Sequence, residues 1–275
     1  MALDISALKQ KLNQFTRQGN RSDALWKPKE GKQIIRIVPW KENPENPFIE
    51  MHFHYLGNKT HLSPTTNGNR DPILEFADAL AAEGTKDAWR QARPFRPKLR
   101  TFVPVVVRGD EAKGVRFMSF GKTVYTELLS IISDPDYGDI TNPEAGHDLV
   151  IEYIPQEKSD TNFAKTMVRP KPKKTPLVDD ASRVEELLED QPDIKSIFKE
   201  PTYEELKAYL EYYLDPEGAP STSRYSGNNN SSSTENTTTS SESSDDDGDE
   251  DDISDDSDTS SSVSDMIDEF DEVFG

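Results

Sequence analysis

Residues 93–122 read RPFRPKLRTFVPVVVRGDEAKGVRFMSFGK, with a β-hairpin signal at the centre of a basic segment. Two runs rich in β-branched and aromatic residues, 103–108 and 115–120, flank a polar segment that begins and ends with glycine. This pattern predicts two antiparallel strands joined by a loop. The stretch also holds eight cationic side chains and only two acidic ones, Asp110 and Glu111. The hairpin is therefore a candidate surface for an anionic ligand.

Four phenylalanines are interleaved with these cations. Phosphates require fixed cations and unstacked bases require flat apolar faces, so the combination favours a single strand over a duplex, which hides its base faces. The other interpretation is that the rings are core residues and the charges are simply solvated. The candidate contacts are Arg93, Phe95, Arg96, Lys98, Arg100, Phe102, Arg108, Arg116, Phe117, Phe120 and Lys122, together with Arg36 in an earlier predicted strand.

The distribution of charge bears on this choice. The chain has 32 basic and 52 acidic residues, and its net charge of −20 alone argues against a polyanionic partner. However, residues 1–126 contain 21 basic and 13 acidic side chains, residues 127–220 contain 10 and 22, and residues 221–275 contain 1 and 17. The acidic residues are thus segregated from the basic hairpin.

Composition also predicts the domain organisation. From position 221 to position 263 the chain is almost entirely polar or acidic, so burial of apolar surface cannot offset the entropy of ordering the backbone. We expect residues 1–21 to form an N-terminal arm, residues 22–220 a core domain, and residues 221–275 a disordered acidic tail.

Several classes of protein are disfavoured. The absence of cysteine excludes disulfides, thiol catalysis and cysteine-ligated zinc. No apolar run approaches the ~20 residues of a membrane span, so we expect an intracellular protein without a membrane partner. His52, His54 and His61 are more typical of surface residues than of a metal site. No nucleophile–base arrangement stands out, so we expect neither an enzyme, nor a metal, nor another cofactor.

The remaining pattern indicates an α+β, β-rich fold with a small Greek-key barrel. In the strand over residues 48–56, alternation predicts Ile49, Met51, Phe53 and Tyr55 on one face and Glu50, His52 and His54 on the other. Residues 57–71 are expected to be loop. Further strands are expected at 34–38, 149–154 and 163–169, and helices are expected to start at 72 and 123 and at capping boxes 182–185 and 202–205.

Residues 169–176, RPKPKKTP, form a second basic segment. The prolines make it stiff and extended. It either lies along a phosphate backbone or spaces two elements, and the sequence leaves both interpretations open.

Both ends of the chain have amphipathic patterns. Near the N-terminus the pattern predicts either a helix packed on its own domain or an arm that docks on a neighbouring protomer; its candidate residues are Leu8, Lys9, Lys11, Leu12, Phe15, Arg17 and Arg21. At the C-terminus, apolar residues recur at three- and four-residue steps among acids; they are Met266, Ile267, Phe270, Val273 and Phe274. This tip indicates a docking motif that folds on a partner, the alternative being a solubility tail.

Four short stretches follow one another along the chain: Trp26-Lys27, residues 34–39 (IIRIVP), Asn46-Pro47-Phe48 and Phe120-Gly121-Lys122. In these stretches and their order, the chain resembles the single-stranded DNA-binding, helix-destabilising protein of T-even-like phages. The resemblance implies an OB-fold core that binds single-stranded DNA in a basic cleft, with aromatic residues at Phe102 and Tyr125. It further implies head-to-tail self-association through the arm, tail contacts with phage replication, recombination and repair proteins, and a location in the cytoplasm of the infected bacterium.

The chain departs from that family in two respects. The family's zinc site uses one histidine and three cysteines; His54 matches the histidine, but no cysteine is present, so residues 58–74 are expected to hold together without metal. The arm also lacks the family's compact motif of three basic and two hydroxyl residues. A different interpretation of the whole chain is an acidic chaperone or scaffold whose tail binds basic proteins.

Overall fold

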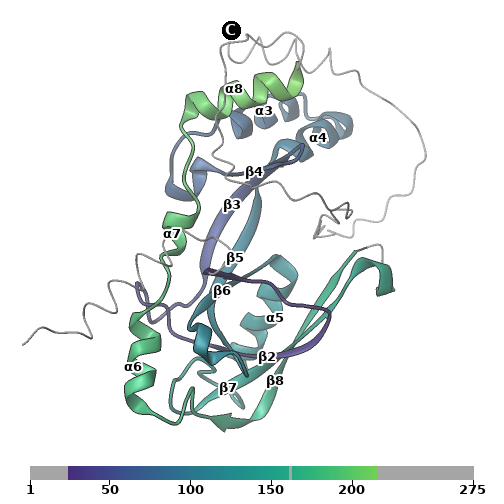
Figure 1. Ribbon diagram of the computed structural model, residues 1–275. Coiled ribbons are helices and arrows are strands. Elements are labelled where there is room, and N and C mark those ends of the chain that lie inside the picture. The colour runs from purple at the N-terminus through teal and green to yellow at the C-terminus, as the bar shows by residue number, and fades with distance from the viewer. Residues whose placement is uncertain (1–23, 161–162, 216–275) are drawn as a thin grey trace, which may run out of the picture. The chain divides into compact units, whose positions relative to one another are not determined.

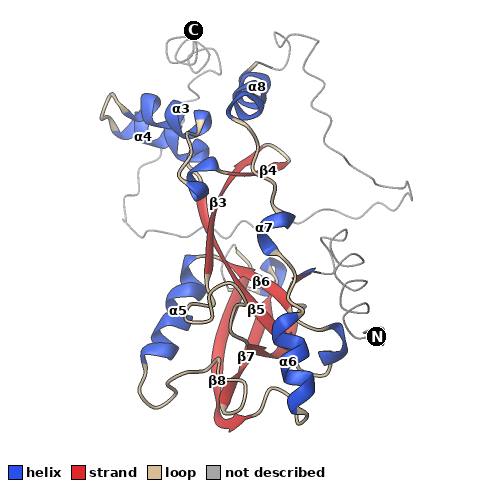
Figure 2. Cartoon of the chain, turned by 90° about the vertical axis from the view of Figure 1, so that its left-hand side faces the viewer, coloured by secondary structure: helices blue, strands red, loops and turns tan. Residues whose placement is uncertain are grey.

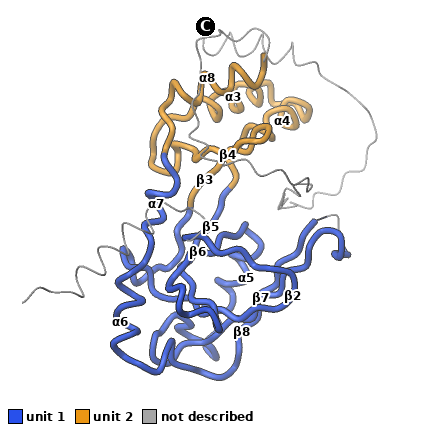
Figure 3. The backbone as a smooth tube through the Cα atoms, viewed as in Figure 1, with its two compact units in different colours: residues 1–50, 99–199, 243–248 blue, residues 51–98, 200–242, 249–275 orange. Residues whose placement is uncertain are grey.

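The computed structural model describes residues 24–160 and 163–215. The described chain divides into two compact units (Figure 3): unit 1 takes in the chain up to Glu50 and Leu99–Lys199, and unit 2 takes in Met51–Lys98 and residues 200–215. The stretch expected to form one core thus contains two units, each with its own hydrophobic cluster. The predicted arm and acidic tail lie outside the described residues.

Unit 1 is built on a sheet with strand order β1-β6-β5-β2-β7-β8 (Figure 1). β1 runs parallel to β6, and the other neighbours are antiparallel. The strands are β1 (Leu25–Trp26), β2 (Gly31–Ile37), β5 (Lys98–Val107), β6 (Arg116–Phe120), β7 (Gly146–Ile154) and β8 (Lys165–Thr175); the helices are α5 (Lys122–Ser133), α6 (Ala181–Glu189) and α7 (Ile194–Ile197). The mixed helix and strand class predicted from the sequence is confirmed, and the sheet is compatible with an OB fold.

The core of unit 1 follows from the alternation of β5. Val103 and Val105 join a cluster with Leu128 of α5, whereas Val106 joins a second cluster with Leu187 of α6. Successive side chains on a strand point to opposite faces, so both faces of β5 are buried. Figure 2 shows α5 and α6 on opposite sides of these strands.

The predicted hairpin of residues 103–120 is confirmed as β5 and β6, paired antiparallel with Val105 opposite Arg116. The strands expected near residues 34 and 149 are β2 and β7. The strand expected at 163–169 is β8, which continues to Thr175 and so includes most of the proline-rich stretch at 169–176. Residues 169, 170, 174 and 175 of that stretch pair with β7, so it is part of the sheet.

Unit 2 packs helices on a short hairpin. Its elements are most of β3 (Ile49–Leu56), β4 (Lys59–Leu62), α3 (Pro72–Ala81), α4 (Lys86–Ala92) and α8 (Tyr203–Leu214). The helix expected at Pro72 is confirmed, as is the capping box of Thr202 and Glu205. Phe76 of α3, Phe95 and Leu210 of α8 belong to one buried cluster.

Three expectations about local structure are wrong. Residues 57–71 are not all loop, because Gly57 (φ 55°) and Asn58 turn the chain into β4. The alternation of β3 changes at His54, which is buried while Tyr55 is exposed, since His54 bonds to buried Asp71. Helix α6 is capped by the side chain of Asp180, one residue before the helix, rather than by Ser182.

Candidate nucleic-acid interface

Two of the arginines expected to contact DNA are structural. Arg36 is 0% exposed; its Nε lies 3.1 Å from Asp148 Oδ1 and its Nη2 lies 2.7 Å from the Thr175 carbonyl oxygen. Arg108 donates to the same Oδ1 through Nε (3.0 Å) and Nη2 (2.8 Å). Burial lowers the pKa of Arg36, and the charge of Asp148 opposes that shift. Arg36 thus ties β7 to the end of β8, and Arg108 ties β7 to Pro176 and Leu177 just after that strand.

The charges of the hairpin loop also neutralise one another. Asp110 accepts from buried Arg116 (2.9 Å) and pairs with Lys113 (3.0 Å). The bond from Lys113 and the charge of Arg116 hold the pKa of Asp110 below its ordinary value. The loop centre is therefore less basic than the sequence indicates, and Arg116 is a structural residue.

The four phenylalanines are core residues. Phe95, Phe102, Phe117 and Phe120 are each at most 3% exposed. The Phe95 ring lies 5.0 Å from Phe76, and the Phe102 ring lies 5.1 Å from Phe198. The expectation that they offer stacking faces does not fit this burial, because packing covers both sides of the strands that carry most of them. The alternative interpretation of the rings as core holds here.

Tyr125, at the start of α5, is half-buried. Its ring packs 5.1 Å from Phe48 and its hydroxyl donates to Glu50 at 2.8 Å. Burial, with the bond to Glu50, raises the pKa of Tyr125 to about 12. The ring is partly exposed, but the carboxylate of Glu50 beside its hydroxyl group would repel a phosphate.

The cations that remain accessible lie mainly before the hairpin. Arg93 and Lys98 are exposed, Arg100 is half-buried, and Lys122 is exposed at the start of α5. Arg96 pairs with Asp78 at 2.8 Å, and its guanidinium carbon lies 4.9 Å from the centroid of the Trp89 ring. Residues 88–100, which we call the basic segment, contain five cations and no acidic residue.

Trp89 is the residue that the sequence analysis missed. It is 54% exposed on α4, while Ala88 and Ala92 form the buried side of that helix. Thr85 caps the helix, and the two alanines that follow it are four residues apart, so they lie on one face of the helix. This spacing is a sequence signal that could have placed Trp89 on the outer face. Arg96 stacks on its ring, an arrangement that also suits a base.

Other exposed aromatic residues also lie in unit 2. Tyr213, 39% exposed, packs edge-on against Phe95 with the ring centroids 6.1 Å apart. The buried residues of α8 are Leu206, Tyr209, Leu210 and Leu214, so Tyr213 lies outside the buried stripe of that helix. Tyr55 and Tyr212 are exposed as well.

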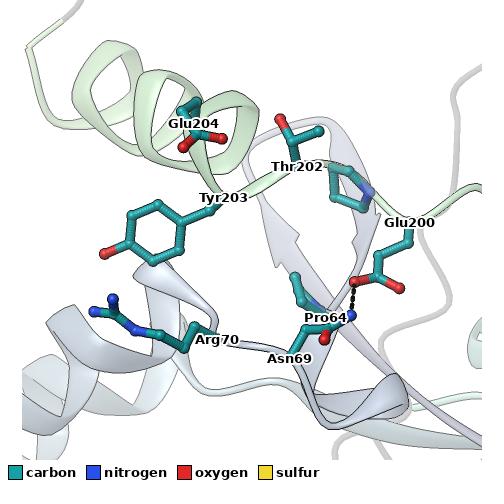
Figure 4. A pocket seen from close by; sticks show the side chains of 8 residues that line it. Pro64, Asn69, Arg70, Glu200, Thr202, Tyr203 and Glu204 are labelled. Atoms are coloured by element: carbon teal, nitrogen blue, oxygen red, sulfur yellow. Dashed lines mark hydrogen bonds between the residues drawn. The ribbon is translucent and has the colours of Figure 1, made fainter.

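A shallow pocket in unit 2 does not suit a phosphate (Figure 4). Its walls include Arg70, Tyr203 and Glu200. Glu200 accepts from Asn69 at 2.7 Å, and Arg70 pairs with Glu75 at 2.8 Å while lying over the Tyr203 ring. The one cation of this pocket is thus already paired, and carboxylates lie beside it.

The sequence model of the family described as "gp32 DNA binding protein like" matches residues 29–212, a span that includes most of both units and the whole basic segment. The chain belongs to this gp32-like family. A comparison with curated proteins gave no match. Membership in a DNA-binding family confirms the resemblance noted from the sequence.

In this gp32-like chain, a polar cluster surrounds His54, the residue that the resemblance matched to the family's zinc-binding histidine. His54 Nε2 bonds to Asp71 Oδ2 at 2.7 Å, and Ser63 donates to the same oxygen. Asp71 Oδ1 also accepts from the backbone of Ile73 and Leu74, which caps α3. Burial raises the pKa of Asp71, but the bonds from His54 and Ser63 outweigh it and hold that pKa below its ordinary value. Asp71 thus connects β3, the end of β4 and α3.

Among the residues described, no group of three or more histidines or carboxylates is arranged to hold a metal ion. None of the helices in that same part of the gp32-like chain is long and apolar enough to cross a membrane.

Proposed function

We propose that this protein binds single-stranded DNA stoichiometrically, without catalysis or cofactor, and that the basic segment is part of the binding surface. The observation that carries the proposal is the exposed Trp89 indole with Arg96 stacked on it, inside a segment that has no acidic residue. Membership in a DNA-binding family supports the same function.

The chemistry of the basic segment suits an unpaired strand. Arg93, Lys98 and Arg100 supply cations for phosphates, and Trp89 supplies a π face on which an unstacked base can lie. Such stacking contributes about 1–3 kcal/mol per base and tolerates any base. A duplex would bring only its phosphates, because its base faces are occupied.

The biological setting follows from the resemblance. The protein coats single-stranded DNA during phage replication, recombination and repair, protects the strand and removes its secondary structure, in the cytoplasm of the infected bacterium. The arm joins protomers head-to-tail, and the acidic tail recruits replication and recombination proteins. The arm and the tail lie outside the described part of the chain, so the support for these two roles is the amphipathic sequence pattern of each segment.

Titration of the full chain into a fluorescently labelled oligothymidine tests the function. We expect saturable binding that weakens steeply with salt, together with weaker binding to a duplex of the same length. Absence of binding at low salt, combined with binding to a basic protein such as a histone, would contradict the proposal and would favour an acidic chaperone.

A further inference from the structure

β8 contains a bulge that carries lysines. Leu149 of β7 pairs with Pro170, and His147 pairs with Lys174, so residues 171–173 of β8 lie opposite Asp148 alone. Three residues opposite one force the backbone of β8 outward. Here we define the β8 bulge as residues 171–174, with Lys171, Lys173 and Lys174.

Buried groups fix both sides of the β8 bulge. His147 donates from Nδ1 to the Lys171 carbonyl oxygen at 2.7 Å. Beyond the bulge, Arg36 donates to the Thr175 carbonyl oxygen at 2.7 Å, and Arg108 donates to that of Pro176 at 2.9 Å. Asp148 holds both arginines. The bulge is therefore a built feature of the sheet, since four polar side chains maintain it.

The close packing under the β8 bulge depends on Gly146. A Cβ there would lie 2.5 Å from the Asn142 carbonyl oxygen and 2.8 Å from Nη1 of Arg36. Contacts this short require the backbone to move. A glycine at this position allows Arg36 to reach the end of β8.

The cations of β8 stand out against an acidic part of the chain. Half of the ten basic residues between 127 and 220 lie on this strand. Arg169 is neutralised by Glu152, but none of the three lysines of the bulge forms an ion pair within the residues that the structure describes. Lys173 and Lys174 are exposed and Lys171 is half-buried. The bulge thus presents three positive charges on a fixed backbone.

The backbone of β8 limits what can bind there. β8 is the last strand on the sheet path, and Pro170 and Pro172 have no N–H group to donate to an added strand. Pairing with a peptide strand is therefore disfavoured. A chain of negative charges that needs no backbone hydrogen bond fits the site better, and a nucleic-acid backbone has that chemistry.

We propose that the β8 bulge binds the phosphate backbone of single-stranded DNA, as a contact additional to the basic segment. This inference rests on the proposed function. It assigns the three lysines to phosphate contact without base stacking, so they add affinity and salt dependence but no preference among bases.

The test compares three forms of the full chain. The variant Lys171→Gln/Lys173→Gln/Lys174→Gln removes the charges of the bulge, and Lys41→Gln/Lys195→Gln/Lys199→Gln removes three exposed lysines elsewhere in unit 1. A third form, Lys171→Arg/Lys173→Arg/Lys174→Arg, keeps the charge. Affinity for a long oligothymidine is measured over a range of salt concentrations, and the thermal midpoint of each variant verifies folding.

For the glutamine variant of the bulge, we expect the slope of log affinity against log salt to fall by about 2, at roughly 0.7 per phosphate contact. The control and the arginine variant should keep the wild-type slope. An unchanged slope, or an equal fall in the control, would overturn the inference while wild-type binding still supports the proposed function. Tighter binding by the glutamine variant would also overturn it, because the lysines would then hold an acidic competitor. Failure of the wild-type chain to bind would instead contradict the proposed function itself.

Discussion

Arg36 and Asp148 form a buried ion pair 3.0 Å long, and Arg108 shares the same carboxylate oxygen. One carboxylate therefore neutralises two guanidinium groups in the interior of unit 1. Removing one partner of a buried pair leaves an uncompensated charge, which is far more costly than losing a surface pair.

Asp148→Asn should therefore destabilise the protein by about 3–5 kcal/mol in urea unfolding. The matched control is Glu152→Gln, whose partners Lys32 and Arg169 are exposed, and it should cost at most about 1 kcal/mol. Equal losses in the two variants would mean that the buried pair does not hold β7 and β8 together.

Trp89 and Phe102 should separate binding from folding. Trp89→Ala should weaken binding to an oligonucleotide by about 1–3 kcal/mol and leave stability nearly unchanged, because the indole is largely exposed. Phe102→Ala should instead destabilise the fold by about 3–5 kcal/mol. Leu129→Ala, an exposed apolar residue of α5, is the control that should change neither. An equal loss of affinity in Leu129→Ala and Trp89→Ala would contradict a specific contact between DNA and the indole.

The stability of the protein should fall between pH 6.5 and pH 4. Burial, with the charges of Lys59 and His54, lowers the pKa of His61 from 6.5 to about 4. In this window the unfolded chain binds a proton that the folded ring does not, so stability is complete above pH 6.5 and is lost as the pH falls. The loss amounts to about 3 kcal/mol in total.

Urea unfolding at several pH values measures this dependence. His61→Leu replaces the titrating ring beside Tyr209 by an apolar side chain that cannot bind a proton. The dependence of stability on pH should therefore be flatter over the same window. If that variant loses stability with falling pH as steeply as the wild type, other groups are responsible.

The tip of the tail should act separately from the DNA site. Replacing Met266, Ile267, Phe270, Val273 and Phe274 by Ala keeps every acidic residue, so affinity for single-stranded DNA should stay unchanged. Binding to replication proteins, measured by calorimetry, should be lost because an amphipathic motif needs its apolar face. An affinity for single-stranded DNA that differs from that of the wild-type chain would show that the apolar tip also affects DNA binding.

The elements that the sequence predicted well are those with a strong local period. The hairpin of β5 and β6 and the helix at Pro72 have a signal within a few residues. The turn at Gly57 and Asn58 has a similar local signal, and the prediction of a loop overlooked it. The prediction of a capping box at Ser182 was wrong because Asp180, two residues earlier, caps the helix with its own side chain.

The site was harder to predict because burial depends on distant segments. Phe102 packs against Phe198, and Arg36 is enclosed by Asp148 and Thr175, all far away in the sequence. The local sequence of a basic stretch therefore does not tell whether a cation or ring in it faces the solvent or the core. Trp89 lies in a short helix without a long apolar period, so the spacing of the two buried alanines was a weak signal of its exposure.

The central claim, that the basic segment contacts DNA phosphates, is tested most directly by the salt dependence of Arg93→Gln/Lys98→Gln/Arg100→Gln. The full chain is titrated into oligothymidine at several salt concentrations, with Lys41→Gln/Lys195→Gln/Lys199→Gln as the charge-matched control. Three lost contacts should lower the slope of log affinity against log salt by about 2, with the control at the wild-type value. A variant that folds, binds and keeps the wild-type slope would contradict the account.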